Sequence, residues 1–226
     1  MCNKLDKLSV AIDGPAGAGK STVAKQVANR LNLVYIDTGA MYRAVTLKAL
    51  RGGVDLDRQE ELTGLARQSR IDLVGGTPQK VFLDGEDVTE EIRTPEVSRS
   101  VSLVAMVPGV REVLVEQQRR LAQETGVVMD GRDIGTVVLP QAQAKFFLTA
   151  SAEERACRRA KELMDKGYTI DITGLTEEIR ERDQLDSNRA VSPLVPAEDA
   201  IIIDSSGMTV EEVVHRIVTE IKQGKL

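Results

Sequence analysis

Five short apolar segments recur along the 226-residue chain, and polar residues or glycines follow most of them. They lie at residues 8–12, 33–36, 127–130, 144–148 and 200–204. Runs of this length are typical of strands that are buried on both faces of a sheet. Segments with helical spacing, such as Val23, Val27 and Leu31, alternate with them, and Thr38 could cap the helix that follows the second run. The pattern therefore predicts an α/β protein with a five-stranded parallel sheet and helices on both faces.

The periodicity changes between the second and third apolar runs. Residues 71–74 and 80–85 flank a turn rich in glycine and proline, which predicts a hairpin or small meander. Residues 86–93 are acidic and typical of a turn. Helices are expected around this piece, at 57–68, from Thr94 and from Val110. This stretch, about 57–121, is expected to be an insert outside the parallel sheet. Two charged helical segments form a second addition at about 153–189. The first is expected to end at Lys166, and the second to run from about Thr176 to Arg189. The remaining core comprises about 1–56, 122–152 and 190–226.

A glycine-rich motif lies between the first predicted strand and the first predicted helix. Its residues match the pattern G-x-x-x-x-G-K-[ST] and are Gly14, Pro15, Ala16, Gly17, Ala18, Gly19, Lys20, Ser21 and Thr22. Glycines let the backbone approach an anion closely, and the N–H groups that begin a helix attract phosphate. In this pattern the lysine contacts the β- and γ-phosphates and the hydroxyl of Ser21 binds Mg²⁺. The motif predicts a nucleoside triphosphate site.

The composition narrows the classes of ligand. A formal net charge of −5 disfavours a general nucleic-acid-binding surface. Among the 30 basic residues, arginines outnumber lysines by 19 to 11, and the planar guanidinium suits local bidentate contacts with phosphate. The single histidine, His215, lies in a predicted surface helix. One histidine cannot supply a multi-histidine metal site, and no triad partners accompany it.

Nothing in the sequence indicates a membrane or secreted protein. The longest apolar runs are too short to span a bilayer, and the polar N-terminal residues do not resemble a signal peptide. Cys2 and Cys157 have no metal-binding spacing, and Cys157 is expected to be a packing residue in a helix. We therefore expect a cytoplasmic monomer whose partners are small molecules, with no nucleic acid or membrane among them.

Two groups of arginines accompany the phosphate loop. Candidates to surround a second phosphate are Arg43, Arg132, Arg182 and Arg189. Arg155, Arg158 and Arg159 could close over the first phosphate. Two anion sites suit phosphoryl transfer between two phosphate-bearing molecules, in which positioning and charge neutralisation lower the barrier. Because an ionised phosphate acceptor requires no histidine base, the composition agrees with this chemistry.

Each of these assignments has a structural alternative. The arginines at 155, 158 and 159 could form a solvated helix face paired with Glu153, Glu154 and Glu162. Asp183 could simply pair with a nearby arginine, and Asp133 could cap a helix. Other protein classes fit less well, since the chain has no N-K-x-D segment for guanine and no strand ending in consecutive acids. A binding module that senses ATP without transferring phosphate remains a second hypothesis.

The runs GPAGAGKST, DTGAMYRA, DGEDVTEEIRTPEVS, VMDGRDIGTVVLP and ERDQLDSNRAVSPLVPA resemble the bacterial cytidylate kinases, a family of P-loop nucleoside monophosphate kinases. The resemblance covers nearly the whole chain. It implies transfer of phosphate from ATP to CMP or dCMP, with Mg²⁺ as cofactor, in pyrimidine metabolism. The β-containing insert would then bind the nucleoside monophosphate, and residues 153–189 would be a helical lid. Kinases of the same fold that act on UMP, AMP or a non-nucleotide acceptor are the nearest alternative.

The resemblance also implies roles for individual residues. The phosphate loop and the lid arginines would bind ATP. The CMP-binding positions would be Thr38, Arg43, Ser102, Arg111, Asp130, Arg132, Asp133, Arg182, Asp186 and Arg189. Within this set, Arg43, Arg132 and Arg189 match phosphate-binding arginines, and Ser102, Arg111 and Asp133 match positions that recognise cytosine. Arg182 and Asp186 match residues near the transferring phosphate and the pentose. The expected catalytic residues are Lys20, Arg132, Arg182 and Arg189.

Overall fold

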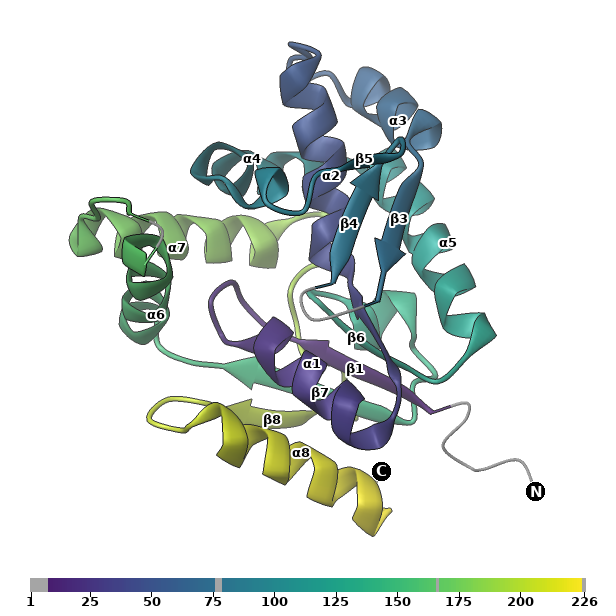
Figure 1. The fold of residues 1–226 in the computed structure, drawn as a ribbon, viewed down its shortest axis with the longest axis vertical. Helices are drawn as coiled ribbons and strands as arrows, with labels where there is room; N and C mark the ends of the chain where they lie inside the picture. The colour runs from purple at the N-terminus through teal and green to yellow at the C-terminus, as the bar shows by residue number, and fades with distance from the viewer. Residues whose placement is uncertain (1–7, 76–78, 166, 225–226) are drawn as a thin grey trace.

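A central sheet of five parallel strands organises the computed structural model, which describes residues 8–75, 79–165 and 167–224. The strand order is β2-β6-β1-β7-β8 (Figure 1). Their bounds are β1 Ser9–Asp13, β2 Val34–Asp37, β6 Val127–Gly131, β7 Ala144–Thr149 and β8 Ile201–Asp204. The predicted five-stranded parallel sheet is confirmed, and each strand lies within about one residue of its apolar run.

Alternate residues of the strands pack against helices on the two faces of the sheet. Val10 and Ile12 of β1 join a core with α1 (Lys20–Leu31) and α8 (Val210–Gln223). Ala11, between them, joins the opposite core with Val115 of α5 (Pro108–Glu124). This alternation follows from the period of two in a strand. Because both faces are covered, the apolar runs are nearly continuous, as the sequence indicated.

The insert forms a layer of its own beside the carboxyl ends of the strands (Figure 1). It contains α3 Gln59–Gln68, α4 Pro95–Met106 and α5, and the antiparallel strands β3 Ile71–Val74, β4 Lys80–Leu83 and β5 Glu86–Asp87. Helix α2 (Thr38–Arg51), which belongs to the predicted core, packs against α3 and α4 of the insert. The predicted meander is confirmed. Glu86 and Asp87, expected in a turn, instead pair with β4. In the glycine- and proline-rich turn expected between β3 and β4, residues 76–78 lie outside the described residues.

Two helices form the charged addition, α6 (Ala152–Asp165) and α7 (Ile172–Asn188). Helix α7 starts four residues before the predicted Thr176, because the Asp171 carboxylate accepts hydrogen bonds from the amides of Thr173 and Gly174. The expected end of α6 at Lys166 lies outside the described residues. None of the helices in the described ranges is both long and apolar enough to cross a membrane.

Two local expectations were wrong. Thr38 does not cap α2; its neighbour Asp37 does, with the carboxylate accepting from the amide of Ala40 at 3.0 Å. The Thr38 hydroxyl instead donates to the backbone carbonyl of Asp130 at 2.6 Å, which ties α2 to β6. Cys157 is exposed rather than packed, because it lies on the solvent side of α6. His215 is exposed on α8, as expected.

Candidate active site

The phosphate loop joins β1 to α1 and has the backbone conformation that its glycines permit. Gly14 has a φ of 143°, and a Cβ there would lie 1.9 Å from the carbonyl oxygen of Leu148. Gly19 has a φ of 84° and precedes α1 directly. Side chains other than hydrogen are strongly disfavoured at both positions. The loop therefore needs these glycines both to turn and to sit close against β7.

Lys20 is buried at the first position of α1, where its ammonium group donates to the carbonyl of Pro15 at 2.7 Å. Burial, together with the nearby charge of Arg132, lowers the pKa of Lys20 to about 7. Both causes oppose a cation in this position. A phosphate group placed against the loop would reverse them by supplying negative charge.

Asp130, at the end of β6, collects hydrogen bonds from three directions. Its carboxylate accepts from the hydroxyl of Ser21 at 2.8 Å and from Tyr35 at 2.7 Å, and its carbonyl accepts from Thr38. Burial raises the pKa of Asp130 to about 6, with a contribution from the negative charge of Asp37, its register partner on β2. Asp130 was predicted among the CMP-binding residues. Its contact with Ser21 places it beside the expected metal ligand.

The donor set at Ser21 suits a hard divalent cation. A hydroxyl and a carboxylate in contact are the oxygen ligands that Mg²⁺ prefers, and Mg²⁺ bound with nucleotides takes few protein ligands and keeps several waters. Across the described residues no cluster of three or more His, Cys, Asp or Glu side chains could hold a metal ion. The chain thus fits a cation carried with a nucleotide better than an all-protein metal site.

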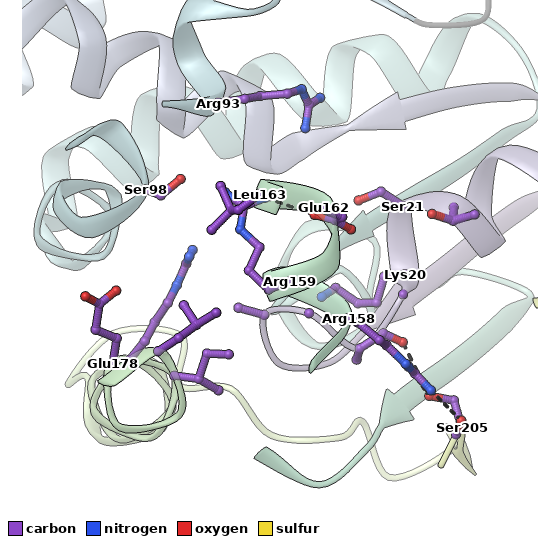
Figure 2. A pocket seen from close by; sticks show the side chains of 18 of the residues that line it. Lys20, Ser21, Arg93, Ser98, Arg158, Arg159, Glu162, Leu163, Glu178 and Ser205 are labelled. Atoms are coloured by element: carbon purple, nitrogen blue, oxygen red, sulfur yellow. Dashed lines mark hydrogen bonds and ion pairs between the residues drawn. The ribbon is translucent and has the colours of Figure 1, made fainter. Parts of the chain in front are cut away.

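One cavity of about 760 Å³ contains the phosphate loop and arginines of the insert and of the charged helices. Residues 16–22 line it together with Arg43, Arg93, Ser98, Ser102, Arg158, Arg159 and Arg182. In Figure 2, Lys20 and Ser21 lie below Arg93 and Ser98 of the insert, across the cavity. The fold therefore brings Arg43 and Arg182 of one predicted group, and Arg158 and Arg159 of the other, to the cavity of the loop. The lining does not include Arg132, Arg155 or Arg189.

Three of the predicted phosphate-binding arginines, Arg43, Arg132 and Arg182, form a partly buried cationic group. Arg132 donates from Nε to the carboxylate of Asp186 at 2.8 Å. Arg182 is buried beside Arg132, and its Nε has no hydrogen-bond partner among the described residues. Burial and the charges of neighbouring arginines together lower the pKa of Arg182 to about 10 and that of Arg43 to about 9. Such mutual repulsion favours the binding of an anion between them.

A second polar group, which is buried, contains Arg111, Asp133 and Arg189. Arg111 pairs with Asp133 and also donates to the carbonyl of Ala105 at 3.1 Å. Nη2 of Arg189 lies 4.0 Å from the Asp133 carboxylate, at the edge of an ion pair. Ser102 Oγ, Arg111 Nε and Arg189 Nη2 have no hydrogen-bond partner within the described part of the chain. Buried polar atoms without partners are costly, so their clustering indicates a place for a polar ligand.

Arg155, Arg158 and Arg159, the arginines expected to close over the first phosphate, have different partners. The Arg155 guanidinium is buried, donates to both oxygens of the Asp183 carboxylate at 3.0 and 2.6 Å, and donates to the Ala16 carbonyl at 3.1 Å. Arg158 donates to Glu154 and to the Ser205 carbonyl. Arg159 pairs with Glu162 at 2.9 Å. Figure 2 shows Arg158 directed to Ser205, whereas Arg159 extends into the cavity.

The pairing with Asp183, Glu154 and Glu162 is the alternative that the sequence left open for these arginines. Arg155 uses all three of its guanidinium nitrogens on protein acceptors, since its Nε donates to the Ala150 carbonyl. It lies beneath the phosphate loop, with its Cβ near Gly17. Its contacts therefore stabilise the loop from within the protein, whereas Arg159 lines the cavity with a partly exposed side chain that a ligand could reach.

Sequence reasoning missed several polar residues of this site. Arg93 lines the cavity and pairs with Asp37 at 3.0 Å, and Ser98 accepts from Arg43 at 2.9 Å. Tyr35 holds Asp130. Among the site residues that were predicted, those directly after a strand were found from that position in the sequence. Arg93 and Ser98 lie near the start of α4, and only the packing of the insert on the sheet brings them to the cavity.

The sheet, the phosphate loop and the arginine-lined cavity define the class of P-loop kinases. A solved structure of similar fold is the shikimate kinase of Bacteroides thetaiotaomicron, with a TM-score of 0.51 at 15% identity, covering 95% of this chain and 98% of that one. The sequence profile of the family described as cytidylate kinase matches residues 10–223. The chain belongs to the cytidylate kinase family, which confirms the resemblance drawn from its motifs.

Individual relatives agree with this membership. The cytidylate kinase of Desulforamulus reducens is 68% identical over 216 residues, which cover 96% of this chain and 97% of the relative. That of Pelotomaculum thermopropionicum is 59% identical over 219 residues, covering 96% and 97%. The cytidylate kinase of Bacillus licheniformis is 56% identical over 213 residues, covering 93% and 94%. The similarity therefore extends through the core, the insert and the charged helices alike.

Proposed function

We propose that this protein transfers the γ-phosphoryl group of ATP to a phosphate oxygen of CMP, yielding ADP and CDP, with dCMP as a second acceptor. The bond from the γ-phosphorus to the β–γ bridging oxygen breaks, and a bond to the CMP phosphate oxygen forms. The observation that carries the proposal is the single cavity, in which the phosphate loop faces Arg43 and Arg182. Membership in the cytidylate kinase family supports cytidine as the acceptor base.

On the donor side, the loop amides and Lys20 bind the triphosphate. Lys20 would exchange its bond to the Pro15 carbonyl for the β- and γ-phosphates. Ser21 and Asp130 would hold Mg²⁺, Ser21 directly and Asp130 through its contact with that hydroxyl. When bound, the ion neutralises charge that develops on the phosphate oxygens. Tyr35 keeps the Asp130 carboxylate oriented to Ser21.

On the acceptor side, guanidinium groups orient the CMP phosphate and stabilise the charge of the transferring group. Arg43, Arg132 and Arg189 would hold the CMP phosphate. Arg182, buried without a partner for its Nε among the described residues, would face the group in transfer. The acceptor oxygen is already ionised near neutral pH, so the mechanism needs positioning and electrostatic stabilisation rather than a general base.

The cytosine would lie against Ser102, Arg111 and Asp133. Within the described residues, the hydroxyl of Ser102 and Nε of Arg111 lack partners that a base edge could provide. A site built from buried polar groups discriminates strongly, because a wrong base leaves those groups unpaired. We expect UMP to be a poor acceptor for this reason. Asp186, which holds Arg132, would lie near the pentose.

The insert and the lid would close over the two nucleotides. The cavity is bordered by α4 of the insert, by α6 and α7, and by the loop of the core, so three parts of the chain share it. Closure would bring Arg159 onto the donor phosphates and exclude water, which suppresses hydrolysis of ATP.

The test is a coupled assay of ADP release with CMP, dCMP, UMP, AMP and shikimate as acceptors, with and without Mg²⁺. We expect CMP and dCMP to give the highest kcat/KM and UMP a value at least about tenfold lower. Greater activity with AMP or shikimate would overturn the substrate assignment. Tight binding of ATP without turnover of any acceptor would instead indicate an ATP-sensing module.

A further inference from the structure

Asp13 is the last residue of β1 and directly precedes the phosphate loop. Its side chain is buried, and its two carboxylate oxygens have separate partners. Oδ1 accepts from the backbone amide of Ile134 and Oδ2 from that of Gly135, each at 2.8 Å. A carboxylate that accepts two backbone amides makes strong, charge-assisted bonds with a defined direction. Strand β1 is thereby joined to a segment 121 residues later in the chain.

The segment that Asp13 holds is the turn after β6. Ile134–Val138 form a short π-helical turn, and Ile134 and Gly135 are its first two residues. Amides at the start of a helical turn have no acceptor within it, so an outside group must supply one. Asp13 supplies it from another strand. The sequence had raised the possibility that Asp133 caps a helix; Asp133 instead uses its backbone carbonyl, which accepts from Val137 and Val138.

The position of this turn determines where two predicted CMP-binding residues lie. Arg132 and Asp133 immediately precede it. In the sheet, the ladder between β1 and β6 fixes the chain as far as Gly131, which is the register partner of Asp13. Beyond Gly131 the chain leaves the sheet, and the ladder no longer constrains it. The hydrogen bonds to Asp13 hold the next part of the chain, which includes Arg132 and Asp133, close to β1.

We propose that Asp13 is a positioning residue that fixes Arg132 and Asp133, and with them the acceptor, relative to the phosphate loop. The inference rests on the proposed CMP kinase function. Asp13 lies at the start of the donor loop and its partners lie at the start of the acceptor site, so one side chain sets the spacing of both. In-line transfer depends on that spacing, since an error of about 1 Å can reduce turnover about 100-fold.

The surroundings of Asp13 leave little room for another arrangement. A Cβ on Gly135 would lie 3.4 Å from Asp13 Oδ2 and 3.2 Å from Cδ of Lys145 on β7. The charged groups that face the carboxylate are Asp133 and Lys20. Close approach of the turn to β1 therefore favours glycine at 135 and a short acidic side chain at 13.

The test is Asp13→Asn, which keeps the size of the side chain. The asparagine oxygen can accept one of the two amides, but its NH₂ group would face the other amide, donor against donor. We expect kcat/KM for CMP to fall about 10- to 100-fold, with the dissociation constant of ATP changed less than about threefold. The preference for CMP over UMP should also fall, because Asp133 shifts. Hydrogen exchange at the amides of Ile134 and Gly135 should accelerate.

The control is Ile217→Val, which removes one buried methyl-sized group from the core beneath α8 and touches no polar group of the cavity. Both variants are assayed at a temperature where circular dichroism shows them folded. An unchanged CMP parameter in Asp13→Asn, or an equal loss in Ile217→Val, would overturn the proposal and leave Asp13 as a stabilising residue. If the unaltered protein does not turn over CMP, the proposed function fails. Hydrogen exchange at the two amides still tests whether Asp13 fixes the turn after β6.

Discussion

At the scale of single residues, the site is distinguished by charged groups that the chain itself satisfies only in part. Lys20 rests on a carbonyl oxygen, and Arg182 has an Nε without a partner in the described ranges. Buried cations of this kind cost stability in the free protein and gain it when a phosphate arrives. Residues of a binding site and residues of a stable core are thus selected by different physical demands.

Replacement of Lys20 by Ala should reduce kcat by at least about 1,000-fold, because the ammonium group stabilises charge on the transferring phosphate oxygens. The fold should persist, since the lysine contributes one hydrogen bond to Pro15 in the free protein. Steady-state kinetics with CMP and a thermal unfolding curve measure the two effects. A variant with near-normal kcat would show that the loop binds phosphate without the lysine.

Arg182→Met should leave the free protein as stable as before, or more stable by about 1 kcal/mol, because it removes a buried cation that lies beside Arg132. Its kcat should nevertheless fall at least about 100-fold. The matched control is Arg120→Met, which removes an exposed arginine paired with Glu116 on the outer face of α5. Urea unfolding and acceptor kinetics distinguish the variants. Marked destabilisation by Arg182→Met alone would show that Arg182 is a structural residue.

At the scale of elements, Arg155 makes a buried contact that joins the phosphate loop to both charged helices. Arg155 on α6 connects Asp183 on α7 with the Ala16 carbonyl of the phosphate loop. A second pair, Arg180 with Glu153, also joins α7 to α6 but is exposed to solvent. Buried bidentate pairs couple their elements strongly, whereas exposed pairs contribute little. The same two helices therefore offer a comparison of the two kinds of contact.

Double-mutant cycles can measure that difference. For Arg155→Met with Asp183→Asn we expect a coupling energy of about 1–3 kcal/mol. For Arg180→Met with Glu153→Gln we expect less than about 0.5 kcal/mol. The free energy of unfolding of each single and double variant, from urea titrations, provides both values. Equal coupling in the two pairs would show that burial beneath the loop does not set the strength of the contact.

The elements also show how far sequence patterns reach. Apolar runs and helical spacing located all five strands of the parallel sheet and the main helices, because buried periodicity is encoded locally. The third strand of the small sheet was missed, since Glu86 and Asp87 are acidic and acquire strand structure only by pairing with β4. Helix α7 began earlier than expected, because Asp171 caps it.

At the scale of the whole molecule, burial at the junction of strands changes the response to pH. Burial raises the pKa of Asp13 to about 6, against 3.8 in a free chain, despite the amides of Gly135 and Ile134. Asp133 opposes ionisation as well, while Lys20 favours it. Between these two pKa values the folded protein binds more protons than the unfolded chain. The contribution of Asp13 to stability therefore falls as pH rises from about 4 to about 6, and is constant above.

Asparagine does not titrate, so the difference in unfolding free energy between the unaltered protein and Asp13→Asn isolates this effect. We expect that difference to decrease by up to roughly 3 kcal/mol between pH 4 and pH 6.5. Urea titrations at four pH values across this range measure it. An increase with pH would mean that the two amides stabilise the carboxylate more than burial disfavours it, with a pKa below that of the free chain.

The sequence alone determined the local features: the five strands, the phosphate loop and most of the arginines that the fold later gathers. These depend on periodicity, on glycine geometry and on the charge of single residues, which need no distant partner. The tertiary structure decided which charges are neutralised. Only packing pairs Arg155 with Asp183, brings Arg93 to the cavity, sets Asp130 against Ser21 and places Asp13 under the amides of Ile134 and Gly135. Contacts across a hundred residues leave no local pattern, because they arise from the meeting of strand ends in a folded sheet.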